Sequence, residues 1–317
     1  MSVPSTTFSF SGHETFPFRY PWMKKGYDAV VDDGGVFQKD DAITTLGVGK
    51  NMVRSIRHWC LAAGVIEEDK EDGARYSPRL RPSELGHLLF GPDGFDAFLE
   101  DPATLWVLHW HITTNVSRAS TWWWTFSHFH EPEFTRDSLS TAVYKWSQTL
   151  PGKKVAEVSV KRDVETFLRT YVPPRTTKGE SSEDSLDCPL VELGLIYPVA
   201  ESGQVYSFSR GSQENLPEGV LLYGMLKFWE QFSPQTETLA IPDIARQPAS
   251  PGQVFKIDEA SLVSRVEQIE TWSDGRISYR ETAGIRQLYR RKKIEPREAL
   301  TLAYGAAVGT DGGTSRE

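Results

Sequence analysis

Residues 47–63 combine two chemically opposite faces at helical spacing, and this stretch constrains the fold more than any other. The apolar stripe consists of Val53, Ile56, Cys60 and Ala63. The second face, at positions i, i+4, i+7 and i+11, consists of Lys50, Arg54, Arg57 and Leu61. Side chains at such spacings share one side of an α-helix. We therefore predict an amphipathic helix that packs on one side and can meet phosphate on the other.

The segments around this helix follow the order of a winged helix. A short helix is predicted over residues 40–46, and the joint Gly47-Val48-Gly49 has the glycine content of a helix-turn-helix connection. After the long helix, residues 64–66 have the pattern of a strand, Asp72-Gly73 supplies a turn, and residues 75–77 are predicted to form the returning strand. Helix, turn, helix and hairpin in this order indicate a winged helix.

The cationic face predicts contact with double-stranded DNA. Residues 47–61 contain three lysine or arginine side chains and no acid, whereas the whole chain has a formal net charge of −8. DNA repels an acidic protein at long range, so binding requires a focused basic surface. Arginine can hold phosphate or guanine, and asparagine can read adenine. The alternative is a basic helix face that is merely solvated.

The expected DNA-binding residues lie on the helix and at the base of the wing. The base is preferred over the tip because residues 67–72 are mostly acidic. The set is Lys50, Asn51, Arg54, Arg57 and Arg75.

Length and composition predict a soluble, cytoplasmic, globular protein. The 317 residues suffice for two or three domains, and 39% of them are hydrophobic. No apolar run approaches the roughly 18 residues of a membrane span, and the N-terminus lacks a secretory signal. Cys60 and Cys188 fit reduced core positions and offer no CxxC zinc site.

The predicted fold class is mainly α with small β-hairpins (α+β), in tandem winged-helix-like units joined by a Trp-rich helix. The predicted divisions are an N-terminal aromatic arm with the first winged helix over 1–130, a second unit over 131–212, a third over 213–310, and a disordered tail over 311–317. Within the first unit, residues 1–34 are expected to be irregular.

The Trp-rich helix is predicted from Ala103 to about Trp124, after the start signal Asp101-Pro102. Apolar residues cover nearly its whole circumference, which is typical of a buried helix. Burial between domains and burial against a second copy, in a homodimer, both satisfy this pattern.

The second and third units rest on weaker patterns. Helices are predicted over 138–148 and 159–171, and the run 188–196 ends like residues 61–66, which suggests an internal repeat. Leucine-glycine helix ends also recur widely, which is the alternative. In the third unit we predict helices over 220–232 and 259–270, and a hairpin over 272–279 with Asp274-Gly275 at its turn.

Candidate catalytic groups lie in the aromatic arm, at His13 and Glu14. A histidine beside a glutamate can act as base and metal ligand, and phosphodiester hydrolysis usually uses a divalent ion such as Mg²⁺ or Mn²⁺. The metal ligands are unknown. The alternative is structural: a salt bridge from Glu14 to Arg19, or a helix cap, with His13 hydrogen-bonded locally. No complete phosphate-binding P-loop and no G-x-S-x-G elbow is present.

Two motifs carry a family resemblance: the run from Phe8 to Tyr20 and the run from Leu46 to Val53. They resemble the SspB-like family of DNA phosphorothioate modification operons. The resemblance implies a phage-defence role beside a cysteine desulfurase and a PAPS-reductase-like enzyme. It further implies a DNA-binding protein that nicks one strand, and it assigns no catalytic residues.

The combined expectation is a metal-dependent nicking endonuclease of this modification system. The alternative is a non-catalytic winged-helix scaffold or transcriptional regulator, because no pattern in the chain compels catalysis.

Overall fold

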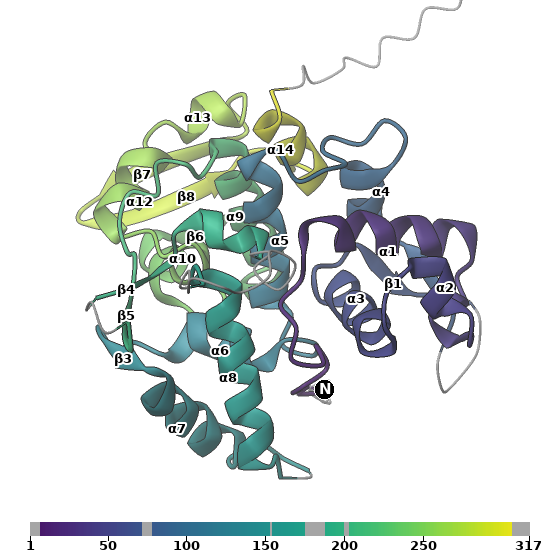
Figure 1. Cartoon of the computed structure of the whole chain (residues 1–317). Helices are drawn as coiled ribbons and strands as arrows, with labels where there is room; N and C mark the ends of the chain where they lie inside the picture. The colour runs from purple at the N-terminus through teal and green to yellow at the C-terminus, as the bar shows by residue number, and fades with distance from the viewer. Residues whose placement is uncertain (1–6, 72–77, 153, 175–187, 200–202, 306–317) are drawn as a thin grey trace, which may run out of the picture. The chain divides into compact units, whose positions relative to one another are not determined.

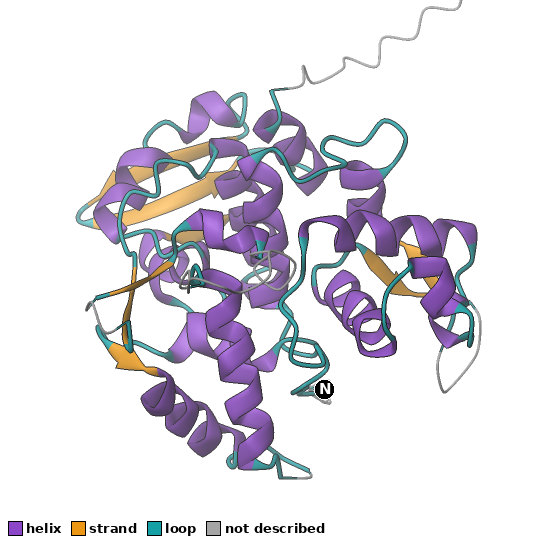
Figure 2. Cartoon of the chain, viewed as in Figure 1, coloured by secondary structure: helices purple, strands orange, loops and turns teal. Residues whose placement is uncertain are grey.

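The computed structural model describes residues 7–71, 78–152, 154–174, 188–199 and 203–305 (Figure 1). Helices dominate, with short antiparallel strands (Figure 2), so the chain is α+β. It divides into two compact units, residues 1–210 with 254–256, and residues 211–253 with 257–317. The finer division into three domains stays a prediction, and the predicted tail lies outside the described residues.

The first unit contains helices and two small sheets, in which η denotes a 3-10 helix. Its elements are α1 (Tyr20–Asp32), η1 (Val36–Gln38), α2 (Ala42–Leu46), α3 (Lys50–Ala62), β1 (Ile66–Glu68), β2 (Leu80–Pro82), α4 (Glu84–Phe90), α5 (Pro102–Thr114), α6 (Ser120–His128), β3 (Phe134–Thr135), α7 (Arg136–Ser147), α8 (Glu157–Tyr171), η2 (Pro189–Leu193), β4 (Ile196–Pro198) and β5 (Val205–Phe208). Strands β1 and β2 pair with each other, and the second sheet has the order β3-β5-β4.

The amphipathic helix predicted over 47–63 is confirmed as α3. Gly47 ends α2 in the left-handed region at φ 61°, where glycine has no steric penalty, and Gly49 precedes the first turn of α3. All four residues of the predicted apolar stripe are buried. Leu61 is buried as well, so its placement on the cationic face was wrong.

The hairpin predicted after α3 is present, with β1 and β2 as its described strands. Ile66 pairs with Pro82 and Glu68 with Leu80, so the returning strand begins at Leu80. The predicted turn and returning segment, residues 72–77, lie outside the described residues.

The aromatic arm is less irregular than predicted, because its second half is helix α1. Pro21 stands at the start of this helix, where its missing N–H costs nothing. Trp22, Met23, Tyr27 and Val30 form its buried side. Their spacing is helical, and the prolines in the segment obscured it.

The predicted Trp-rich helix is two helices, α5 and α6, separated by residues 115–119. Near the break, the hydroxyls of Thr113 and Thr114 donate to carbonyl oxygens of the preceding turn. The amide of Asn115 donates to the carbonyl oxygens of Leu61 and Ala62 at the end of α3. This contact fixes the chain where the prediction continued the helix.

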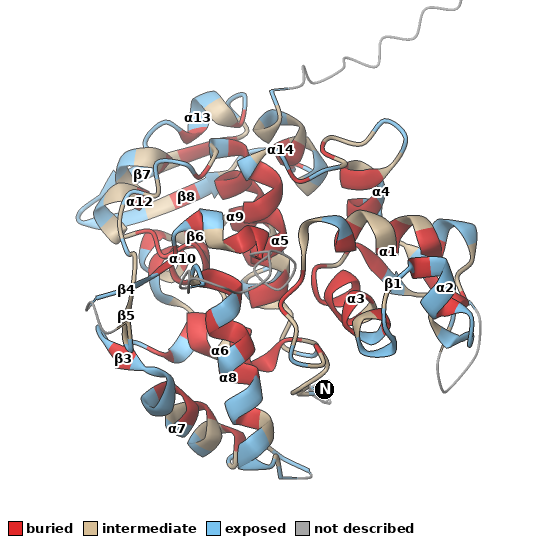
Figure 3. Cartoon of the chain, viewed as in Figure 1, coloured by how far each residue is buried: buried red, intermediate tan, exposed pale blue. Residues whose placement is uncertain are grey.

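Most residues of helix α5 are buried (Figure 3). Trp106 and Trp110 pack against Phe255, with ring centroids 5.6 and 5.3 Å apart. The apolar circumference is therefore explained within one chain, and the homodimer stays a prediction. Cys60 and Cys188 are buried and unbridged, as predicted.

The second unit consists of helices around one three-stranded sheet. Its elements are α9 (Glu218–Phe232), β6 (Thr238–Ala240), α10 (Ile241–Arg246), α11 (Pro251–Val254, whose last residue belongs to the first unit), α12 (Glu259–Val266), α13 (Ile269–Trp272), β7 (Ile277–Thr282), β8 (Ile285–Arg290) and α14 (Pro296–Ala303). The sheet has the order β6-β8-β7.

The hairpin predicted over 272–279 was wrong in position. Asp274 and Gly275, at φ 50° and 70°, form the turn between α13 and β7. The hairpin turn is Ala283-Gly284, at φ 52° and 79°, between the paired residues Thr282 and Ile285. A two-residue turn with both φ angles positive suits the twist of a hairpin.

Within the described ranges, no helix combines the length and apolarity that crossing a membrane requires.

Candidate nucleic-acid interface

The N-terminal half of α3 presents the predicted cationic surface. Lys50, Asn51 and Arg54 are exposed, and the first turn contains no acid. Arg57, one turn further on, is only partly exposed. Burial lowers the pKa of its guanidinium, the positive charge of Arg118 adds to this, and Glu68 opposes it. The surface accessible to a large partner is thus centred on Lys50, Asn51 and Arg54, while Arg75 lies outside the described residues.

A loop over residues 11–16, here called the arm loop, crosses this helix and contains both predicted catalytic residues. His13 is only 1% exposed, and its Nε2 lies 2.9 Å from Oδ1 of Asp163 on α8. The backbone N–H of Thr15 donates to Nδ1 of His13 at 3.1 Å. Because Nδ1 accepts, the neutral ring carries its proton on Nε2 and donates it to Asp163.

Asp163 is a buried acceptor for three different donors. Besides His13, it accepts from the backbone N–H of Ser11 at 2.6 Å and from the hydroxyl of Thr121 at 2.8 Å. A buried carboxylate needs such partners, because desolvation without them is costly. Asp163 thereby ties the arm loop to α6 and α8.

Helix α3 holds the other side of the arm loop. Ser55 donates its hydroxyl to the carbonyl oxygen of His13 at 3.0 Å, and the indole N–H of Trp59 donates to that of Phe16 at 2.9 Å. Gly12 allows the close approach, since a Cβ there would lie 2.4 Å from Nδ1 of His58.

The backbone of the arm loop is strained. Three of its non-glycine residues have positive φ, namely Ser11 at 64°, Glu14 at 49° and Thr15 at 66°. Such conformations cost about 1–3 kcal/mol each and persist only where the surroundings enforce them. The contacts from α3, α6 and α8 supply that enforcement.

Glu14 points to the surface, away from His13. Its Oε1 lies 3.6 Å from Nη1 of Arg54, with the two side chains 33% and 55% exposed. The predicted alternative partner, Arg19, lies instead over the ring of Trp22. The structure therefore brings Glu14 to the predicted DNA-binding residues of α3, and it does not bring His13 and Glu14 together.

Two residues next to the arm loop escaped the sequence analysis, Asp163 and His58. His58 is buried, and its Nε2 has no hydrogen-bond partner among the described residues. Its pKa is lowered to about 3, mainly by burial and to a smaller extent by the neighbouring His13, Arg118 and Arg57. For Asp163 the available signal was an acid at core spacing between Val160 and Phe167. His58 gave no comparable signal.

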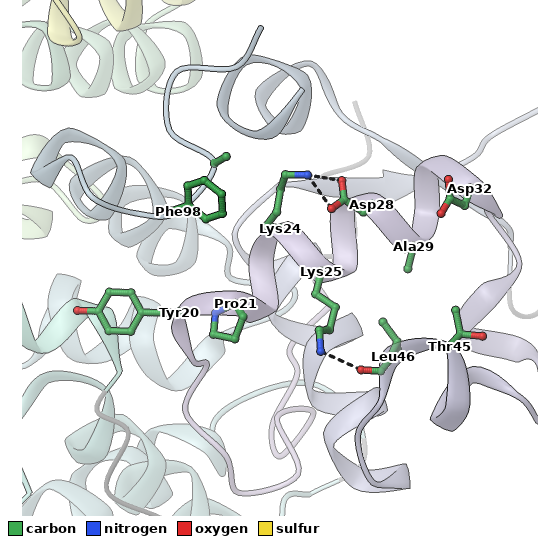
Figure 4. Close-up of a pocket in the computed structure, with 11 residues that line it drawn as sticks. Tyr20, Pro21, Lys24, Lys25, Asp28, Ala29, Asp32, Thr45, Leu46 and Phe98 are labelled. Carbon is green, nitrogen blue, oxygen red and sulfur yellow. Dashed lines mark hydrogen bonds and ion pairs between the residues drawn. The ribbon is translucent and has the colours of Figure 1, made fainter. Parts of the chain in front are cut away.

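A separate hollow of about 480 Å³ lies over the outer side of α1 and the end of α2 (Figure 4). Three of its four charged side chains are already engaged, since Lys24 contacts both oxygens of Asp28 at 2.5 and 2.6 Å and Lys25 donates to the carbonyl oxygen of Leu46 at 3.0 Å. Phe98, which is 74% exposed, lines its rim. None of the site residues discussed above belongs to this lining.

Metal ligands do not converge in the part of the chain that the structure describes. There, no three histidine, cysteine, aspartate or glutamate side chains gather closely enough to hold an ion. The described residues therefore do not fit a metal site formed by protein ligands alone, and we assign no chemical step to a metal.

Comparison with known families identifies the chain. A family model described as "Protein of unknown function (DUF4007)" matches residues 10–304. The chain belongs to the DUF4007 family. No curated protein matches this DUF4007 chain.

Two solved structures are similar to this DUF4007 chain. A magnesium ion-bound SspB crystal structure has a TM-score of 0.86 and 29% sequence identity. The match covers 96% of this chain and 91% of the SspB chain. A second SspB crystal structure has a TM-score of 0.84 and 29% sequence identity. This match covers 94% of this chain and 88% of the SspB chain. The predicted SspB-like character is therefore confirmed.

Proposed function

We propose that this chain is the duplex-DNA-binding component of a bacterial DNA phosphorothioate modification and phage-defence system. The observation that carries the proposal is the exposed surface of Lys50, Asn51 and Arg54 on α3, bordered by Glu14 of the arm loop. The likeness to SspB supports the system to which the chain is assigned. Its partners there are the cysteine desulfurase and the PAPS-reductase-like enzyme.

The chemistry of α3 suits a polyanion. Its first turn has free backbone N–H groups and the positive end of the helix dipole, with no acid to oppose them. Lys50 and Arg54 add two charges on the same side, and Asn51 supplies a side chain that can bind adenine. A recognition helix of a helix-turn-helix motif contacts bases through its N-terminal residues in this way.

The order of elements supports winged-helix units. Helices α2 and α3 followed by the β1–β2 hairpin match a helix-turn-helix with a wing. The two three-stranded sheets, β3-β5-β4 and β6-β8-β7, also share one plan, in which the last strand lies between the first and the second. We propose that the three regions are variants of this motif.

The finer proposal is strand nicking beside Arg54, with Glu14 as the catalytic residue. Glu14 has its carboxylate at the surface where a phosphate held by Arg54 would lie. His13 is a positioning residue, because its bond to Asp163 holds the arm loop in place. Since one similar structure is magnesium ion-bound, dependence on a divalent ion belongs to this proposal, without assigned ligands.

A second candidate is a non-catalytic scaffold or transcriptional regulator. The burial of His13, at 1% exposure, favours it, because a buried imidazole cannot exchange a proton with a phosphate at the surface. In this case the arm loop only positions α3 on DNA.

A plasmid assay with a gel shift separates the candidates. Purified protein and supercoiled plasmid are incubated with Mg²⁺ or Mn²⁺, and open circles indicate nicking, whereas a gel shift with intact plasmid indicates the scaffold. Lys50→Glu should weaken the gel shift in both cases. Lys145→Glu, which reverses an exposed lysine on α7, is the matched control and should leave it unchanged. Equal binding by wild type and Lys50→Glu would remove α3 from the interface.

A further inference from the structure

A second concentration of positive charge lies in the second unit. Residues 276–298 contain eight lysine or arginine residues and three glutamates, in a chain of net charge −8. Most of this charge belongs to strands β7 and β8 and to the turn that follows them (Figure 1). We refer to residues 280–293 as the basic hairpin.

One face of the basic hairpin is open and mostly polar, with the exposed Ile285 at its turn end. Arg280 lies opposite Gln287, and Tyr289 follows two residues later on the same face. Arg280 and Tyr289 are exposed, whereas Leu288 on the other face is buried in the core of the unit. Arginine, glutamine and tyrosine are side chains that commonly donate hydrogen bonds to phosphate.

Several charges of the basic hairpin are not neutralised. Arg286, Arg291 and Lys293 each form an ion pair with a glutamate. Arg280 and Lys292 are exposed and have no ion pair within the described part of the chain. These two side chains therefore leave a positive surface on the hairpin and the turn after it.

Arg290 is a further cation of the basic hairpin without an acidic partner in contact. Its guanidinium stacks 4.2 Å from the ring centre of Trp229, and its Nε and Nη2 have no hydrogen-bond partner among the described residues. It lines a cavity of about 220 Å³ together with Lys293 and Glu230. Because Nε and Nη2 are buried, Arg290 lies on the core-facing side of β8 with Leu288 and is not part of the exposed surface.

We propose that the basic hairpin is a second DNA-binding surface that holds backbone phosphates through Arg280 and Lys292. The inference rests on the proposed function and extends it, because α3 alone provides only a few contacts. Apart from Ala283, Ile285 and Tyr289, the exposed side chains of the hairpin are charged or polar, which suits phosphate better than an apolar protein partner. The contact is with phosphate and therefore independent of DNA sequence.

The salt dependence of duplex binding tests the proposal. Each phosphate contact contributes about 0.9 to the slope of log K against log salt concentration. Arg280→Ala with Lys292→Ala in the full chain should reduce this slope by about 2. Affinity should fall about fivefold per removed charge, the ratio expected for one charge pair at about 4 Å in water.

The matched control is Arg246→Ala, which removes an exposed arginine of α10 in the same unit. It should change neither slope nor affinity, and thermal unfolding checks that each variant is folded. The expected loss should also be the same for unrelated duplex sequences, since phosphate contacts carry no base readout.

The outcomes separate the two proposals. If wild type binds DNA and Lys50→Glu weakens it, but the double variant binds with an unchanged slope, the basic hairpin is excluded and the proposed function stands. If wild type binds no duplex, both are overturned. If the double variant keeps its DNA affinity but loses binding to poly-glutamate, the surface recognises an acidic protein and the DNA assignment is overturned.

Discussion

Oε1 of Glu14 lies 3.6 Å from Nη1 of Arg54, so the arm loop places a carboxylate beside an exposed cation of α3. A DNA phosphate that binds Arg54 would compete with this carboxylate, since both are anions and need the same donors. The pair is half-exposed, and pairs of this kind contribute little to stability. Its position at the interface therefore matters more for function than for folding.

Glu14→Gln separates catalysis from binding. We expect loss of nicking in the plasmid assay with DNA affinity intact or slightly increased, because the amide cannot act as a base and no longer competes as an anion with phosphate for Arg54. The free energy of unfolding, measured in urea, should change by less than about 1 kcal/mol, which is the usual contribution of an exposed ion pair. Nicking at the wild-type rate would exclude Glu14 from the chemistry.

Arg54 and Arg57 should differ in their contribution to DNA binding, although the sequence places both on one face. Arg54 is exposed, whereas burial beside Arg118 and Glu68 restricts Arg57 and lowers its pKa. Arg54→Ala should lower the salt slope of duplex binding by about 1, and Arg57→Ala by less. The comparison is made by fluorescence anisotropy over a range of salt concentrations. A larger effect at Arg57 would contradict the assignment.

The sequence predicted the elements whose patterns are local. The four-residue apolar stripe of α3 follows from a 3.6-residue period, and its burial confirms it. The hairpin turn predicted at Asp274-Gly275 was wrong because positive φ angles occur at helix ends as well as in hairpins. The dipeptide therefore indicates a turn but not whether a helix or a strand precedes it.

The candidate site could be predicted only in part. The spacing on α3 identified Lys50 and Arg54, but Asp163 is 150 residues away from His13 in the sequence. No periodicity links residues at that separation, because their contact depends on the packing of the arm loop between α3 and α8. Adjacent residues in a turn also diverge, which is why His13 is buried and Glu14 is not.

Asp163→Ala should destabilise the first unit by about 3 kcal/mol or more. It leaves the donors of Ser11, His13 and Thr121 buried without an acceptor, at about 1–3 kcal/mol for each unsatisfied group. Urea unfolding measures the change. Glu165→Ala, an exposed acid on the same helix, is the control and should remain near wild type. Equal stability of the two variants would exclude Asp163 as the anchor of the arm loop.

Removal of divalent metal should leave DNA binding intact. The proposed contacts are made by Lys50, Asn51 and Arg54, which are not metal ligands, and no group of metal ligands gathers among the described residues. A gel shift in EDTA should therefore match one in Mg²⁺ at equal ionic strength, while any nicking stops. Loss of the gel shift in EDTA would place a metal in the DNA interface itself.

His58 should make the protein less stable as the pH falls. Its pKa is about 3 in the folded chain because it is buried, compared with an ordinary value of 6.5. Between these values the unfolded chain takes up a proton that the folded chain does not, so the free energy of unfolding decreases with decreasing pH. The decrease for one such site is about 1.4 kcal/mol per pH unit. His109, whose pKa burial also lowers to about 3, adds a second site.

His58→Phe removes one of these two sites and keeps a ring of similar size. Between pH 6 and pH 4, the slope of unfolding free energy against pH should fall by about 1.4 kcal/mol per pH unit, which corresponds to one proton fewer taken up on unfolding. Urea titrations at several pH values measure this slope. A poor fit of the new ring would lower the unfolding free energy by the same amount at every pH and would therefore leave the slope unchanged. The variant also eliminates a buried nitrogen without a hydrogen-bond partner, so part of any misfit is offset. An unchanged slope would mean that His58 is protonated in the folded protein, and the arm loop beside it would then have to accommodate a buried charge.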